Sequence, residues 1–120
     1  MRIRHLTIEN FRAIERLDFD CSGNVNAFIG DNGAGKSTVL EAIALLYSWL
    51  NAKISSSRGR GRIIRKDDVR TGSEYCFLSI EAEHKGKIAR WSLLRGEAPA
   101  DSKKKQTDLK ELESFVMHIR

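Results

Sequence analysis

The feature that most constrains this chain is the run GDNGAGKS at residues 30–37. It matches the phosphate-binding (Walker A) pattern of Gly, four residues, Gly-Lys and then Ser or Thr. Glycines lack a Cβ, so backbone N–H groups can close around phosphate oxygens. Lys36 offers an ammonium for the β- and γ-phosphates of a nucleotide, and the Ser37 hydroxyl suits a Mg²⁺ ligand.

The flanking residues decide whether this pattern is meaningful, because the loop must follow a strand and open a helix. Residues 25–29 are a short apolar run typical of a buried strand. Residues 36–50 contain good helix formers and neither Gly nor Pro, and they predict a helix whose positive dipole end points at the loop. A Gly-rich turn that matches by chance is the alternative, and both flanks disfavour it.

The remaining periodicity predicts antiparallel strands and a second helix. Alternating apolar and polar residues predict two strands before the loop and a hairpin after the first helix. The four ranges are 3–8, 14–19, 74–84 and 87–95. Residues 108–120 carry apolar side chains at helical spacing, with Asp108 as a candidate cap and Glu111 three residues on. We therefore expect an α/β fold in which a strand, a phosphate loop and a helix accompany antiparallel strands.

Composition narrows the function classes. A hydrophobic fraction of 41% and a charged fraction of 31% are ordinary for a globular protein. The N-terminus alternates charged and apolar residues, unlike a signal peptide, and the longest apolar stretch, 39–50, is too short to span a bilayer. We expect a cytoplasmic protein without membrane contact. Cys21 and Cys76 lie in apolar, strand-like surroundings and predict buried, reduced thiols.

Residues 52–72 change in composition and predict a flexible basic loop within the chain. Seven Lys or Arg lie between Lys53 and Arg70, against Asp67 and Asp68. A solvated loop is one interpretation, and contact with nucleic-acid phosphates is the other. No aromatic residue is interleaved, so base stacking has no support. The net charge of +5 permits such contact without requiring it.

Two stretches together resemble a known group of proteins. IENFR at residues 8–12 and FIGDNGAGKSTVLEAI at residues 28–43 resemble the N-terminus of ABC-type P-loop ATPases that act on DNA. The group includes SMC and RecF proteins and the AAA ATPases of the OLD and Septu type in bacterial defence. The resemblance is strong over residues 1–50 and continues weakly through residues 67–72 and the hairpin.

The resemblance implies an ATPase head that binds ATP with Mg²⁺, pairs with a second head and is coupled to DNA. By position, Lys36 would bind the β- and γ-phosphates, Ser37 would bind Mg²⁺ and Thr38 would lie at the α-phosphate. Backbone donors would come from Gly30, Asp31, Asn32, Gly33, Ala34 and Gly35. Arg12 matches an arginine that lies near the nucleotide in the family. A surface arginine in a turn between strands is the alternative for Arg12.

The sequence also departs from the family. It lacks the signature motif with a Ser-Gly-Gly core and the apolar strand that ends in Asp-Glu, so we assign no catalytic residue. Gln106, a conceivable Mg²⁺ contact, lies in a lysine-rich stretch. We expect residues 1–120 to be the N-terminal lobe of a head with an incomplete sheet. Exposed apolar surface should make it self-associate. Hydrolysis would need the missing half or a partner.

Three rival functions remain. A GTPase or kinase is disfavoured, because the sequence has no Asn-Lys-x-Asp motif and two strands precede the loop strand. A remnant that no longer binds nucleotide is the second rival. The third is a basic module that binds nucleic acid through residues 53–70.

Overall fold

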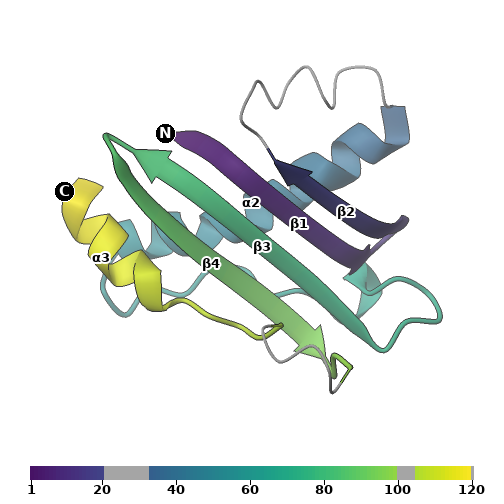
Figure 1. Ribbon diagram of the computed structural model, residues 1–120. Coiled ribbons are helices and arrows are strands. Elements are labelled where there is room, and N and C mark those ends of the chain that lie inside the picture. Colours follow the sequence, from purple (N-terminus) through teal and green to yellow (C-terminus); the bar gives the residue numbers. More distant parts are fainter. Residues whose placement is uncertain (21–32, 100–104, 120) are drawn as a thin grey trace.

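The structure is a computed structural model that describes residues 1–20, 33–99 and 105–119. Four antiparallel strands form one sheet in the order β2-β1-β3-β4 (Figure 1). Their bounds are β1 (Arg2–Phe11), β2 (Ile14–Asp20), β3 (Tyr75–His84) and β4 (Lys87–Gly96). All four strands predicted for this part of the chain are confirmed, and so is the pairing of the first two.

Two α-helices of the described residues, α2 (Gly33–Ser55) and α3 (Lys110–Ile119), complete the α/β fold. Helix α2 runs behind the sheet in the view of Figure 1, and α3 packs at one end against β4 and α2. A short 3-10 helix, η1 (Lys66–Asp68), lies between α2 and β3. Every strand pair described is antiparallel, so the sheet is incomplete for a phosphate-loop fold, whose loop strand normally sits in a parallel sheet. The strand predicted at 25–29 falls outside the described residues.

The β3–β4 hairpin shows how sequence pattern becomes structure here. Residues 76, 78, 80 and 82 of β3 are buried, while the residues between them, apart from residue 77, are only half-buried. Lys85 and Gly86 have φ of 49° and 84°, the positive values that a two-residue type I′ turn requires. Such a turn fits the right-handed twist of the strands and sets the register that pairs His84 with Lys87.

Helix α2 is longer than the sequence predicted. The expected range was residues 36–50, but the helix spans Gly33–Ser55. Residues 51–55 contain no Gly or Pro, and Ile54 packs against the core, so burial extends the helix by more than a turn. The predicted basic loop at 52–72 therefore begins inside α2, and η1 lies within it. The flexibility of this loop stays a prediction.

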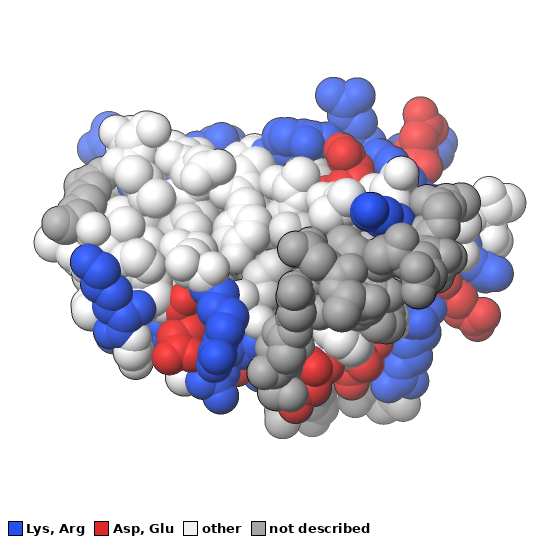
Figure 2. Space-filling view, turned by 90° about the horizontal axis from the view of Figure 1, so that it is seen from above, with Lys and Arg blue, Asp and Glu red and all other residues white. Residues whose placement is uncertain are grey.

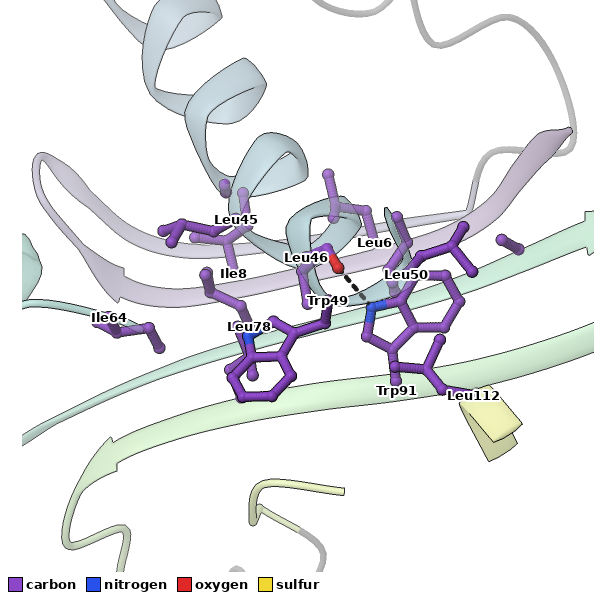
Figure 3. Close-up of a cluster of buried hydrophobic side chains, with 14 of the residues drawn as sticks. Leu6, Ile8, Leu45, Leu46, Trp49, Leu50, Ile64, Leu78, Trp91 and Leu112 are labelled. Atoms are coloured by element: carbon purple, nitrogen blue, oxygen red, sulfur yellow. Dashed lines mark hydrogen bonds between the residues drawn. The ribbon is translucent and has the colours of Figure 1, made fainter. Parts of the chain in front are cut away.

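The core lies between the sheet and the two helices. Figure 3 shows α2 side chains, including Leu46 and Trp49, facing apolar side chains of the strands and α3. Trp91 of β4 is fully buried, and its indole N–H donates to the Leu46 carbonyl at 2.8 Å (Figure 3). The Phe115 ring lies 6.1 Å from the Trp91 ring, centroid to centroid. One side chain thus joins β4, α2 and α3.

Some apolar surface stays exposed, as the sequence predicted. Leu40 on α2 is 45% exposed, Ile63 is 61% exposed and Met117 on α3 is 71% exposed. Figure 2 shows a broad area of uncharged residues on one face, with charged side chains gathered around it. Self-association through such a surface stays a prediction. Neither α-helix of the described residues has the length and apolarity needed to cross a membrane.

Replacing Trp91 with Phe should destabilise the protein by about 2–4 kcal/mol, because it leaves a cavity and removes the hydrogen bond to Leu46. Urea unfolding followed by circular dichroism would measure this change. The matched control is Ile88→Val on the same strand, where the side chain is 43% exposed. It should change stability by less than about 0.5 kcal/mol. Equal effects of the two substitutions would contradict the central place of Trp91.

Cys76 should be unreactive in the folded protein. Burial, with a smaller contribution from the charge of Asp68, raises the pKa of its thiol from 9.0 to about 12. The thiolate is the reactive form, so at pH 8 almost none is present. In a Cys21→Ser background, a disulfide-exchange reagent should label Cys76 only after denaturant is added. Rapid labelling of the folded chain would show that the thiol is accessible.

Candidate functional site

The beginning of α2 presents a cation and a hydroxyl together. Lys36 and Ser37 lie in the first turns of the helix, and both side chains are exposed. The first turn of the helix carries no acidic side chain, and the positive end of the helix dipole lies there. An ammonium, a hydroxyl and the N–H groups of a helix N-terminus suit a Mg²⁺-bound phosphate chain.

The structure describes only some of the other residues predicted for the loop. Gly33, Ala34 and Gly35 begin α2 and Thr38 follows, half-buried. Residues 30–32, which include the predicted donors Gly30, Asp31 and Asn32, lie outside the described residues.

Arg12 lies in the turn between β1 and β2, at φ 54°, a left-handed conformation that non-glycine residues rarely adopt. Its backbone N–H donates to the Asp68 carbonyl at 2.7 Å, and its Nε donates to Asp68 Oδ1 at 3.1 Å. The guanidinium also lies 5.1 Å from the centre of the Phe11 ring. The side chain of Arg12 is thus held in one place although it is 42% exposed.

Arg12 also lies near a second carboxylate, that of Glu41 on α2. Arg12 Nη2 lies 4.0 Å from Glu41 Oε1, and Glu41 follows Ser37 by one helical turn. Arg62 Nη2 bonds the same Glu41 oxygen at 2.6 Å. Through Glu41, Arg12 lies near α2. Whether Arg12 contacts a nucleotide stays a prediction.

Asp68 is the partner that sequence reasoning missed. It is only 8% exposed, and its second oxygen accepts the Arg65 backbone N–H at 3.0 Å. The ion pair with Arg12 joins residues 56 positions apart in the sequence. No local spacing rule connects such residues, so the sequence could not indicate this pair.

The basic loop is fixed to α2 along part of its length. The Trp49 indole N–H donates to the Arg62 carbonyl at 2.9 Å, and the Arg62 N–H donates to Ser48 Oγ at 2.8 Å. At Gly61 a Cβ would come within 2.6 Å of Trp49 atoms, so only glycine fits this close approach. These contacts hold Arg62 where its side chain meets Glu41.

The opposite face of the sheet carries a separate polar hollow of about 560 Å³. Glu9, 7% exposed, accepts hydrogen bonds there from Tyr75 Oη at 3.0 Å and Lys105 Nζ at 2.8 Å. The bond to Glu9 raises the pKa of Lys105, while burial and then Glu9 raise the pKa of Tyr75. Gln106 lines this hollow, away from α2, so the structure does not bring it to the candidate site.

The rest of the described chain offers no other chemistry of this kind. No group of three or more His, Cys, Asp or Glu side chains that could hold a metal ion occurs among residues 1–20, 33–99 and 105–119.

A protein-family model described as an AAA domain matches residues 5–118 of this chain. Among curated proteins, the chain is 32% identical over 88 residues to a retron Ec83 probable ATPase of Escherichia coli. It is 42% identical over 78 residues to the DNA replication and repair protein RecF of Leptospira interrogans. It is 33% identical over 88 residues to a DNA double-strand break repair Rad50 ATPase of Sulfurisphaera tokodaii. The resemblance to RecF-type ATPases is thereby confirmed.

These matches cover 72%, 65% and 73% of this chain, but only 16%, 19% and 9% of the three relatives. The chain thus spans less than a fifth of each. A solved chain from structural work on ATP-driven dimerization and DNA-stimulated activation of SMC ATPases aligns with 98% of this chain and 78% of its own length. Its TM-score is 0.48 and its sequence identity is 17%.

Replacing Asp68 with Asn should lower stability by about 1–3 kcal/mol, because Asn has one oxygen for the two donors that Asp68 satisfies. Thermal and urea unfolding would measure the loss. Asp67→Asn is the matched control, since Asp67 is the exposed neighbour in the same 3-10 helix. It should cost less than about 0.5 kcal/mol. If Asp68→Asn leaves the stability unchanged, the buried ion pair does not stabilise the fold.

Proposed function

Because the chain belongs to the AAA-domain family, we propose that it binds ATP with Mg²⁺ through the loop that opens α2. The observation that carries the proposal is the exposed pair Lys36 and Ser37 at the positive end of a helix of 23 residues with no acidic side chain in its first turn. The family match makes a chance Gly-rich turn a poor explanation of the motif.

Each residue has a role that follows from its chemistry. Lys36 neutralises the β- and γ-phosphates, and Ser37 donates an oxygen ligand to Mg²⁺. Residues 30–35 and Thr38 contribute donors to the phosphates. Arg12 adds a second positive charge from the β1–β2 turn. These groups bind and orient a nucleotide, and together they form one half of an ATPase site.

Hydrolysis requires groups that this sequence does not contain. Attack on the γ-phosphate needs a residue that orients and activates water, and no apolar strand ending in Asp-Glu occurs in the 120 residues. We propose that this base comes from another part of the protein or from a partner, either the C-terminal half of the head or a second head. We do not expect residues 1–120 to hydrolyse ATP on their own.

The biological setting follows only from the relatives. RecF and Rad50 are described as DNA repair proteins, and the third relative as a retron ATPase. We propose that this chain serves an ATPase of DNA repair, chromosome maintenance or anti-phage defence, with DNA as a candidate partner. The match covers at most 19% of each of these relatives, so the choice among the three processes is left open.

Calorimetric titration with Mg·ATP tests the proposal. The parent chain should bind, and Lys36→Ala should reduce affinity at least about a hundredfold, because a charged phosphate contact of about 3 kcal/mol is lost. Lys53→Ala is the matched control, since Lys53 lies in the last turn of the same helix. It should leave affinity within about twofold. Equal binding by Lys36→Ala and the parent would contradict the proposal.

The same variants test the basic loop as a rival function. The exposed side chains of Arg58, Arg60 and Arg62 favour polyanion binding through phosphate attraction. Binding to a DNA duplex that falls steeply with salt and ignores Lys36→Ala would support this second role. Binding that needs both Lys36 and nucleotide would instead link DNA to the ATP site.

A further inference from the structure

Segment 66–70 fastens the β1–β2 turn from outside the strand pair. The Arg12 N–H donates to the Asp68 carbonyl, and the Arg70 N–H donates to the Asn10 carbonyl at 2.9 Å. Phe11 and Val69 form an antiparallel bridge between these two bonds. The turn is thus held by a short piece of sheet that no hairpin rule requires.

The fastened turn is strained. Asn10 and Arg12 have φ of 56° and 54°, and neither is glycine. Such conformations cost free energy and persist only where the surroundings fix them. Here Asp68 supplies both a backbone and a side-chain acceptor to Arg12, so the same residue holds the turn and aims the guanidinium.

The Arg12 guanidinium points toward α2. Glu41 alone does not hold Arg12, because the Arg12–Glu41 distance of 4.0 Å is long and Arg62 occupies the same Glu41 oxygen at 2.6 Å. Asp68, at 3.1 Å and with a side chain only 12% exposed, is the firm partner. Removing Asp68 would leave Arg12 free to swing into solvent from its exposed position.

We propose that Asp68 is a positioning residue for the nucleotide site: it fixes the Arg12 guanidinium near Glu41, one turn after Ser37 on α2. Mg·ATP affinity therefore depends on Asp68 only through Arg12. The inference rests on the proposed function and adds a residue outside the phosphate loop. Its partner across the turn, Arg12, touches the nucleotide, and Asp68 does not.

A double-mutant cycle tests the positioning role. Asp68→Asn and Arg12→Ala should each weaken Mg·ATP binding by about tenfold, and the double variant should be no weaker than Arg12→Ala alone. Asp67→Asn should stay within about twofold of the parent. A purely structural role for Asp68 would add its effect to that of Arg12→Ala, and this additivity would overturn the inference.

A second measurement needs no nucleotide. The Arg12 Nε–H resonance should be resolved and slow to exchange in the parent and in Asp67→Asn, but fast to exchange in Asp68→Asn. If Asp68→Asn fails to fold, Arg12→Lys replaces it in the binding test, because lysine keeps the charge and lacks the Nε–H donor. Parent-like affinity in Arg12→Lys would then overturn the inference.

These experiments distinguish a failure of the proposed ATP binding from a failure of the positioning role of Asp68. If a folded parent does not bind Mg·ATP, or if Lys36→Ala binds as well as the parent, the proposed function fails and the inference falls with it. If Lys36→Ala abolishes binding while Asp68→Asn binds normally, only the positioning role of Asp68 fails.

Discussion

The structure depends on burying α2 against an antiparallel sheet. The helix carries its apolar side chains around more than one side, and the sheet covers the side that holds Leu46 and Trp49. Trp91 secures this contact with both packing and a hydrogen bond to the helix backbone. Because α2 opens at the phosphate motif, the same packing fixes where Lys36 and Ser37 stand. The stability of the core and the geometry of the site therefore depend on the same packing of α2.

Local pattern predicted most of the fold. Alternation located all four described strands, and Gly86 suits the hairpin turn because glycine accepts the positive φ that the turn requires. Helical spacing located α3, where Asp108 Oδ1 accepts the Lys110 N–H. Glu111 does not complete a capping box, because its side chain accepts the Arg90 N–H instead. The end of α2 was misplaced, since burial of Ile54 is a tertiary effect.

Only the site residues that are adjacent in the sequence could be predicted. The loop motif is a local pattern, so Lys36 and Ser37 could be found from spacing. Arg12 was a candidate only through the family resemblance, and its place near Glu41 does not by itself test that role. Asp68 and Arg62 could not be found, because their contacts depend on how the segment after α2 folds back over the β1–β2 turn. Charge composition indicated a basic loop and could not show that one of its acids is buried.

The sheet order has a consequence for how this lobe meets other molecules. Strand β2 is an outer strand, and its backbone groups on one side have no neighbour within the described sheet. Glu15, Arg16, Asp18 and Asp20 are all exposed along it. Charged side chains on an edge oppose the docking of another strand, which protects the sheet from growing into an aggregate. The charged edge of β2 therefore disfavours growth of the sheet by strand pairing.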